Sequence, residues 1–221
     1  MKTRLISIGL ILMLSVPLAI AQNPGNAKMA FAVLGGVNFQ NLNGKDINGD
    51  KLENDMTIGF HAGVNVQIPL VPMFFFQPGL LFSTKGAKYT NGSIKLSYVE
   101  LPLNLVYKAL VGNGKFMLGF GPYIGYAIGG KVKPESGTAT DIEFKNIVET
   151  GDPTAVTYFK AFDAGGNIFA GYELASGIFI QLDTQIGMLK INPEDNRTEP
   201  VYSAESAVKN TGFGLSIGYR F

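Results

Sequence analysis

Long stretches in which apolar and polar side chains alternate residue by residue dominate this chain. Eight such segments can be marked, at roughly 30–40, 56–68, 73–84, 96–108, 116–129, 160–172, 178–190 and 211–221. A period of two is the pattern of a β-strand whose two faces meet different environments. Each segment has 11 to 14 residues, whereas strands of soluble proteins average about 5–6 residues. The pattern therefore predicts an all-β chain with unusually long strands.

The length of these segments suits a membrane crossing. At a rise of about 3.3 Å per residue and a tilt of about 45°, eleven residues cover about 25 Å along the membrane normal, which is the height of the apolar band of an outer-membrane barrel. A closed barrel is the sheet that leaves no unpaired backbone groups in hydrocarbon. We therefore predict an eight-stranded antiparallel transmembrane β-barrel with an up-and-down meander.

The connections between the segments alternate strictly in length. The long ones span 41–55, 85–95, 130–159 and 191–210, and the short ones span 69–72, 109–115 and 173–177. Bacterial outer-membrane barrels combine long outer loops with short periplasmic turns. The alternation predicts four outward loops and places both ends of the barrel domain in the periplasm.

The first 21 residues have the pattern of a secretory signal peptide. Lys2 and Arg4 precede an almost wholly apolar stretch, 5–20, and an Ala-Ile-Ala box ends at Ala21. The alternative, a helical membrane anchor, needs about 20 apolar residues. We expect cleavage after Ala21, which leaves a barrel domain at 22–221.

The composition agrees with an exported membrane protein. The chain has no cysteine, which rules out disulfides and a lipid-bearing N-terminal cysteine. Charged residues make up only 16% of the chain, below the roughly 25% that is usual for soluble domains. Without the basic residues of the signal peptide the chain has 16 basic and 17 acidic side chains, so we expect no nucleic-acid partner.

The position of the few charges within the segments indicates which face meets lipid. Away from the segment ends there are four, Glu100, Asp163, Asp183 and Arg220, and all fall on the face that carries Gly, Asn, Gln and Ser. The main structural alternative, a soluble lipocalin-like carrier, would place charged side chains outside and apolar ones inside. We therefore expect the apolar face to contact lipid and the polar face to line the lumen.

The inward charges are the first candidate site. We expect Arg220 to lie beside Asp183 and Gln181 of the preceding strand, with Asp163 and Glu100 extending this polar network. Such a network can act as a gate, or it can hold a closed lumen together as paired charges. The second interpretation is favoured, because side chains fill the interior of an eight-stranded barrel.

His61 is the one histidine of the chain and lies on the polar face. It would be the general base if the protein were an outer-membrane lipid-modifying enzyme, and a third alternative is a narrow pore. Ser83, Ser97 and Ser216 are all possible partners by phase, so none is singled out. Catalysis needs an oriented set of groups. We predict that His61 is a hydrogen-bonding lumen residue and that the protein is not an enzyme.

One loop resembles a calcium-binding loop in part. Asp46, Asn48 and Asp50 have suitable spacing, but Lys51 stands where Gly is required and Thr57 where Glu is required. We predict a solvated loop, no metal site and no cofactor.

Three stretches resemble a known family. They are YVELPLNLVYK at 98–108, GFGPYIGYAIGGK at 119–131 and GLSIGYRF at 214–221. The chain resembles the small outer-membrane β-barrel family of Bacteroidetes, the outer membrane protein beta-barrel domain typified by PorT-like proteins. The resemblance implies a place in the cell outer membrane and a structural or interaction role, and it does not single out the protein-secretion role of PorT.

The same resemblance implies partners. A terminal strand with an apolar face and Phe221 at its end is similar to the signature by which the barrel-assembly machinery recognises its clients. The other implied partners are outer-membrane lipid and, through the outer loops, other envelope proteins.

Overall fold

The computed structural model describes residues 28–46, 48–197 and 206–221. The predicted signal peptide, 1–21, lies outside the described residues. Within these ranges no helix combines the length and apolar character needed to cross a membrane.

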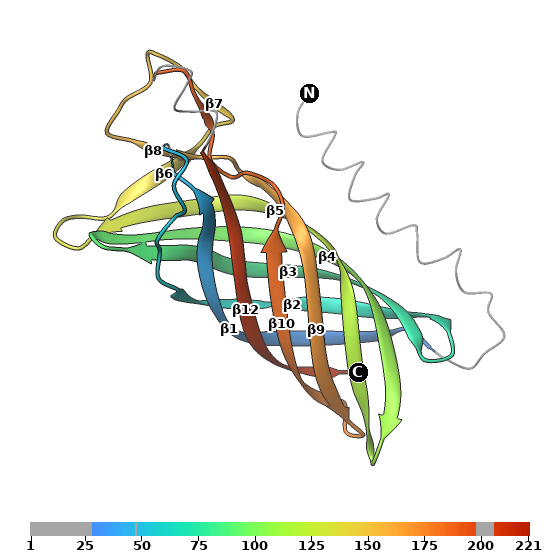
Figure 1. The fold of residues 1–221 in the computed structure, drawn as a ribbon. Coiled ribbons are helices and arrows are strands. Elements are labelled where there is room, and N and C mark those ends of the chain that lie inside the picture. Colours follow the sequence, from blue (N-terminus) through green and yellow to red (C-terminus); the bar gives the residue numbers. More distant parts are fainter. Residues whose placement is uncertain (1–27, 47, 198–205) are drawn as a thin grey trace.

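Eight long strands form a closed antiparallel barrel (Figure 1). They are β1 (Ala30–Lys45), β2 (Thr57–Val71), β3 (Phe74–Tyr89), β4 (Gly92–Val111), β5 (Gly114–Pro134), β9 (Phe162–Leu174), β10 (Ile178–Gly187) and β12 (Ala207–Arg220). Each pairs with the next barrel strand along the chain. The first and last strands close the barrel through a register that runs from Ala32↔Arg220 to Lys45↔Ala207. The predicted all-β, eight-stranded, up-and-down barrel is confirmed.

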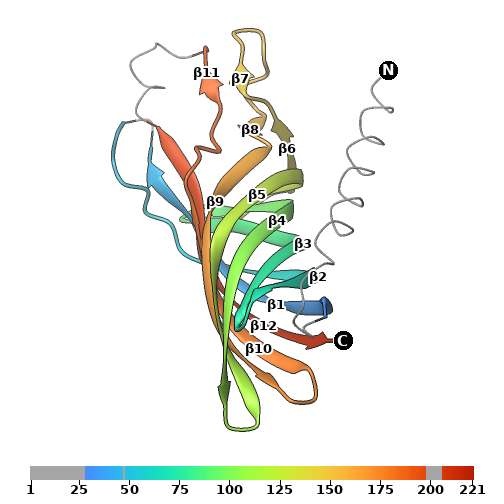
Figure 2. The ribbon, with the colours of Figure 1, turned by 90° about the vertical axis from the view of Figure 1, so that its right-hand side faces the viewer.

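One end of the barrel carries the short connections. Tight turns follow β2, β4 and β9 there, and the C-terminal end of β12 lies beside them (Figure 2). The backbone N–H of Phe221 donates to the carbonyl of Phe31 over 2.8 Å. In the turn before β10, Gly177 has φ +91°, a conformation that disfavours residues with a Cβ. In bacterial outer-membrane barrels the short-turn end faces the periplasm.

At the opposite end of the barrel, the strands extend well beyond the bounds of the predicted segments. Residues 85–95, expected to form an outer loop, instead continue β3 and β4 as a hairpin that closes at the pair Tyr89↔Gly92. The expectation was wrong because this stretch, KGAKYTNGSIK, lacks regular apolar alternation. Backbone pairing holds the two strands together here, and inward side chains such as Ala87, which is 1% exposed, are still buried.

The two longest outer connections also contain strands. The first carries β6 (Thr140–Phe144), β7 (Ile147–Val148) and β8 (Thr157–Phe159), and the second carries β11 (Glu194–Asp195). β6 pairs with β5 and, in parallel, with β8. β7 and β11 pair in parallel and so join the two loops. We call β6, β7, β8, β11 and the residues between β6 and β8 the outer lobe (Figure 2).

The barrel wall is apolar outside and polar inside. Ile180, Leu182 and Ile217 project outward and are 53%, 61% and 64% exposed. Inward positions hold buried amides and charges, for example Gln67 and Glu100, which are 2% and 1% exposed. A soluble barrel has the opposite arrangement, so the lipocalin-like alternative is wrong.

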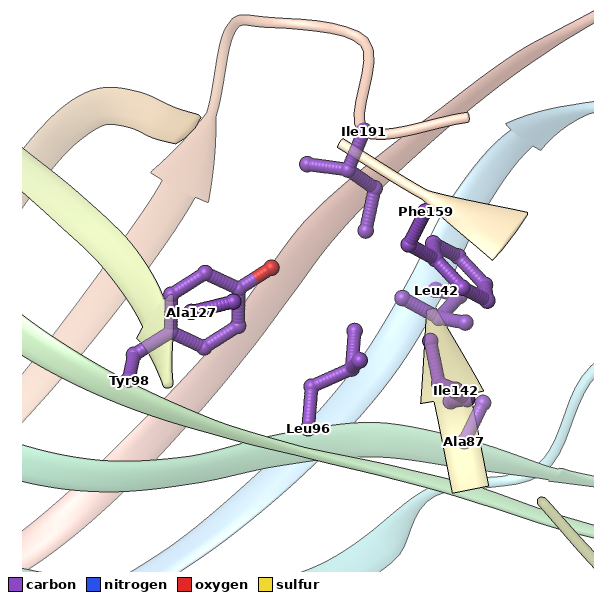
Figure 3. Packing of buried hydrophobic residues seen from close by; sticks show 8 residues of the cluster. All are labelled: Leu42, Ala87, Leu96, Tyr98, Ala127, Ile142, Phe159 and Ile191. Carbon is purple, nitrogen blue, oxygen red and sulfur yellow. The ribbon is translucent and has the colours of Figure 1, made fainter. Parts of the chain in front are cut away.

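The lumen is layered rather than uniformly polar. Towards the outer lobe an apolar cluster fills it, made of Leu42, Ala87, Leu96, Tyr98, Ala127, Ile142, Phe159 and Ile191 (Figure 3). Towards the short turns a second apolar cluster fills it, made of Ala32, Val106, Met117, Phe169 and Phe179. We call them the outer and inner apolar clusters. The polar side chains between them form the central polar layer.

Candidate functional site

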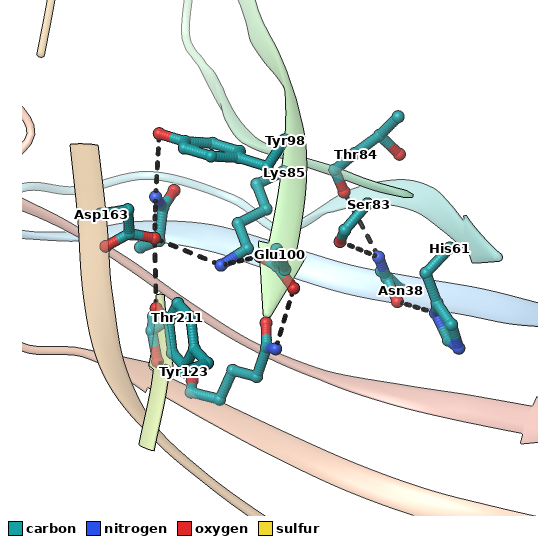
Figure 4. A network of polar contacts seen from close by, with 12 residues as sticks. Asn38, His61, Ser83, Thr84, Lys85, Tyr98, Glu100, Tyr123, Asp163 and Thr211 are labelled. Atoms are coloured by element: carbon teal, nitrogen blue, oxygen red, sulfur yellow. Dashed lines mark hydrogen bonds and ion pairs between the residues drawn. The ribbon is translucent and has the colours of Figure 1, made fainter. Parts of the chain in front are cut away.

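A buried lysine lies in the central polar layer (Figure 4). Lys85 Nζ is 2.6 Å from Glu100 Oε1 and 3.2 Å from Asp163 Oδ2, and all three side chains are at most 1% exposed. The ammonium also lies 4.3 Å from the centre of the Tyr123 ring. The sequence interpretation missed Lys85 because the third segment was ended at residue 84. Its odd position, in phase with Ser83, was the signal that could have placed it inside.

The two carboxylates that bind Lys85 have further partners. The Tyr123 hydroxyl donates to Asp163 Oδ2 over 3.1 Å, and Asn210 Nδ2 donates to the same oxygen over 2.9 Å. Gln185 Nε2 donates to Glu100 Oε2 over 3.1 Å. The structure therefore brings Glu100 and Asp163 together around a cation, as a buried and hydrogen-bonded charge cluster.

His61 forms hydrogen bonds at both ring nitrogens. Nε2 lies 2.7 Å from Ser216 Oγ, and Nδ1 is hydrogen-bonded to Asn38 Oδ1. Asn38 Nδ2 donates in turn to Ser83 Oγ over 3.0 Å. A Cβ on Gly36 would lie 2.0 Å from the Leu215 carbonyl oxygen and 2.8 Å from His61 Cε1, so a glycine at this position makes room for the imidazole. Ser216 is thus the serine that meets the ring.

Amide, imidazole and hydroxyl groups in this order resemble a nucleophilic triad. Their surroundings differ from those of a catalytic site, because Ser216 is 1% exposed. The adjoining cavity, lined also by Asp183, Gln181 and Glu100, has a volume of about 50 Å³. That is room for a few water molecules.

Arg220 does not pair with Asp183 or Gln181, and that prediction is wrong. In the register of β10 and β12, Asp183 lies opposite Gly214 and Gln181 opposite Ser216. A Cβ on Gly214 would be 2.9 Å from either oxygen of Asp183. Arg220 lies six residues beyond Gly214, at the short-turn end of β12. The register across the connection 191–210 determines these partners, and local sequence does not reveal it.

Arg220 instead belongs to a second charge cluster at the short-turn end. Its Nε donates to Glu173 Oε2 over 2.8 Å, and its Nη1 donates to Asn65 Oδ1 over 3.0 Å. Lys108 Nζ binds the same Glu173 oxygen over 2.7 Å. Lys108 and Glu173 were missed because both lie at or beyond the ends of the predicted segments. We call Lys108, Glu173 and Arg220 the periplasmic cluster.

The outer lobe has its own charged pairs around one aromatic ring. Lys145 binds Asp152, and Arg197 Nη2 binds Asp195 Oδ2 over 2.8 Å. Both cations lie 5.4 Å from the centre of the Tyr158 ring. The hydrogen bond from Lys145 lowers the pKa of the Asp152 carboxyl below its ordinary value, and the bond from Arg197 lowers the pKa of Asp195.

The loop considered for calcium uses its first carboxylate internally. Asp46 Oδ1 accepts from the backbone N–H of Asn48 over 2.8 Å and of Asp50 over 3.0 Å. In the parts of the chain that the structure describes, no three His, Cys, Asp or Glu side chains come together in a way that could hold a metal ion.

Comparisons with known proteins place the chain in a family. No curated protein matches it. Among solved structures, Ail, the attachment invasion locus protein of Yersinia pestis, is 11% identical, with a TM-score of 0.43, and the match covers 88% of this chain and 100% of that chain. The complex of Ail with the heparin analogue sucrose octasulfate gives 12% identity, the same TM-score and the same coverage. The family described as outer membrane protein beta-barrel domain matches residues 20–191, and the chain belongs to this family of outer-membrane barrels.

Proposed function

We propose that this outer-membrane barrel is not an enzyme or a pore, and that it has a structural or interaction role carried by its outward loops. The observation that carries the proposal is the layered lumen. Apolar clusters fill it on both sides of the central polar layer, and the cavity between them measures about 50 Å³. The packed side chains of the described residues and the small cavity leave a solute no open passage through the barrel, so contacts with partners fall to the outer surface.

The outer lobe supports this role because it is organised before any partner binds. The parallel pair β7–β11 links two loops, and the N–H of Asn196 donates to the Val148 carbonyl over 2.9 Å. Ile147 of the lobe is 45% exposed. Little ordering entropy remains to be lost on association with such a preformed surface.

The test is site-specific photocrosslinking in intact cells. A photoreactive residue at Ile147 should give a discrete crosslink to another envelope protein, identified by mass spectrometry. The matched control is Leu182, which is exposed on the lipid-facing wall and should give no protein adduct. Absence of any protein crosslink from Ile147 and from further lobe positions would contradict the proposed interaction role.

The lipid-modifying alternative has one observation in its favour, the hydrogen-bonded series Asn38, His61 and Ser216. The burial of Ser216 argues against it, because an acyl substrate cannot reach the hydroxyl oxygen through the wall. A fluorophosphonate that labels activated serines should therefore leave Ser216 unmodified. Labelling of Ser216 that disappears in the His61→Ala variant would establish the enzyme instead.

Three finer assignments belong to the same proposal. We infer that residues 1–21 are removed on export, on the strength of Lys2, Arg4 and the box ending at Ala21. N-terminal sequencing of the mature protein should begin at Gln22.

We also infer that the barrel-assembly machinery receives the chain through β12, whose Tyr219 and Phe221 rings pack edge to face at 4.9 Å. Replacing both rings by Ala should reduce insertion into the outer membrane.

Placement in the PorT-like branch rests on the resemblance of 98–108, 119–131 and 214–221. If it holds, deletion of the gene should impair protein secretion across the outer membrane. Normal secretion in the deletion strain would assign the protein to another branch of the family.

A further inference from the structure

A cavity of about 620 Å³ lies at the short-turn end of the barrel. The turns that follow β4 and β9 frame it, and the last residues of β12 lie against it. Leu110 and Leu174 on its rim are 77% and 49% exposed, so the rim lies at the surface. Its volume is within the range of about 300–1,000 Å³ that is usual for small-molecule sites. We call this cavity the vestibule.

The periplasmic cluster forms one side of the vestibule. Lys108 Nζ and Arg220 Nε bind a single carboxylate oxygen, Glu173 Oε2, at 2.7 and 2.8 Å. Lys108, Arg220 and Glu173 are only 6%, 8% and 7% exposed. One carboxylate cannot neutralise two cations. The ammonium and guanidinium groups also carry more N–H donors than Glu173 and Asn65 can accept.

Two further cations complete the lining. Lys28 and Lys115 line the vestibule and are exposed. Among the described residues around it, Glu173 is the sole acidic side chain. Even with the α-carboxylate of Phe221 counted, four cations against two anions leave a net charge of +2. The vestibule is therefore an electropositive recess in a chain whose overall charge is close to zero.

We propose that the vestibule binds a small polyanion that carries phosphate or clustered carboxylate groups. Buried cations are screened less by water and salt than surface lysines. A guanidinium next to an ammonium presents planar and point-charge donors to one anion. Such a ligand reaches this site from the periplasm, either as a free solute or as the phosphate of a lipid headgroup at the rim. The inference is independent of the role proposed for the outer loops.

The test measures binding of inorganic pyrophosphate to the full chain by isothermal titration calorimetry. The protein is purified from the outer membrane in zwitterionic detergent. Lys115→Gln should weaken binding by about 2- to 5-fold, the usual range for one exposed charge. Glu173→Gln should tighten binding, because it removes the acidic side chain that competes with the ligand for Lys108 and Arg220. A purely structural role for Glu173 does not predict tighter binding.

The matched control is Lys131→Gln, at the opposite end of the barrel. Lys131 is exposed and lies 3.9 Å from Asp141, and its loss should leave pyrophosphate binding unchanged. Folding of every variant is checked by heat-modifiable migration in gels. If Glu173→Gln does not fold, the double variant Lys28→Gln with Lys115→Gln replaces it and should weaken binding more than Lys115→Gln alone.

Lipid nanodiscs distinguish the two sources of the anion. Pyrophosphate binding that persists in phosphatidylglycerol discs indicates a free solute. Binding seen in phosphatidylcholine discs and abolished in phosphatidylglycerol discs indicates a lipid headgroup. No binding in either disc, or equal affinity of the wild type, Lys115→Gln and the Glu173 or double-lysine variant, overturns the proposal.

Discussion

At the scale of single residues, the charges of the lumen depend on one another. Lys85 is enclosed between β3, β4 and β9, and two carboxylates and the face of an aromatic ring replace its hydration shell. Such a cluster adds little net stability when complete, but loss of one member leaves the others buried without a counter-charge. Lys85 thus keeps Glu100 and Asp163 compatible with a membrane interior.

Replacement of Lys85 by Met should destabilise the barrel by about 3–5 kcal/mol, because Glu100 and Asp163 would remain buried without their cation. The free energy of unfolding is measured in lipid vesicles by urea titration, followed by tyrosine fluorescence. The control, Lys131→Met, removes an exposed lysine and should leave the transition midpoint nearly unchanged. Equal midpoints for Lys85→Met and the wild type would show that the cluster is not essential.

The sequence predicted on which side of the barrel wall each charged residue lies, but it did not predict which residue it pairs with. The alternation of side-chain direction along each strand predicted that Glu100, Asp163 and Arg220 point inward, and all three are buried. The prediction was possible because the other face of a strand that spans lipid is regularly apolar. Partners depend on the stagger between strands, which the sequence of the long connection before β12 does not encode locally. Arg220 was therefore assigned to Asp183, although Glu173 on β9 lies at its level.

At the scale of elements, the sequence shows strands where lipid enforces alternation. The wall strands were recognisable because every second residue faces hydrocarbon, as in β12. The outer ends of β3 and β4, and the whole of β6 and β8, do not show this regular alternation. Backbone pairing and burial of Ala87, Ile142 and Phe159 in the outer apolar cluster hold them in place, but their sequences lack a regular apolar alternation, so they were read as loops.

The pairing of β7 with β11 should depend on pH. The Asp152 and Asp195 carboxyls have an ordinary pKa of 3.8, and their bonds to Lys145 and Arg197 lower it in the folded lobe. A lowered pKa contributes stability that is complete above the ordinary value and is lost as pH falls through the folded value. Hydrogen exchange at the Asn196 amide, normalised to its intrinsic rate, should stay slow down to about pH 4 and accelerate below it.

The control for this transition is Asp152→Asn, which removes one of the titrating carboxylates. Its Asn196 amide should already exchange faster near neutral pH and should show a flatter dependence on acid. Protection in the wild type that persists unchanged in strong acid would show that these ion pairs do not support the lobe.

At the scale of the whole molecule, side chains of the described residues fill the barrel, and no open channel runs along its axis. Apolar side chains occupy both halves of its axis, and charge is confined to the layer between them and to the periplasmic cluster. Both binding surfaces that we propose therefore lie at the ends of the barrel. The outer end offers a shaped lobe, and the inner end offers an electropositive recess.

Planar-bilayer recordings of the wild-type protein should therefore show no stepwise ionic current in molar salt. Ions would have to leave water and pass through a tightly packed interior that has apolar clusters on both sides of the central polar layer, which is strongly unfavourable. A porin reconstituted by the same procedure serves as the positive control. Reproducible current steps from this protein would show that the apolar clusters open.

The pairing of β1 with β12 has a consequence for biogenesis. It joins residues near opposite ends of the sequence, such as Ala32 and Arg220, so the seam is the most non-local contact of the sheet. Contacts of this kind form slowly. Until β1 and β12 pair, the growing sheet has two edge strands with unpaired backbone groups that can pair with other chains. Neither edge can be paired until the last strand, β12, has been synthesised and exported. We therefore expect the chain to be most prone to aggregation in the interval between export and closure of the barrel.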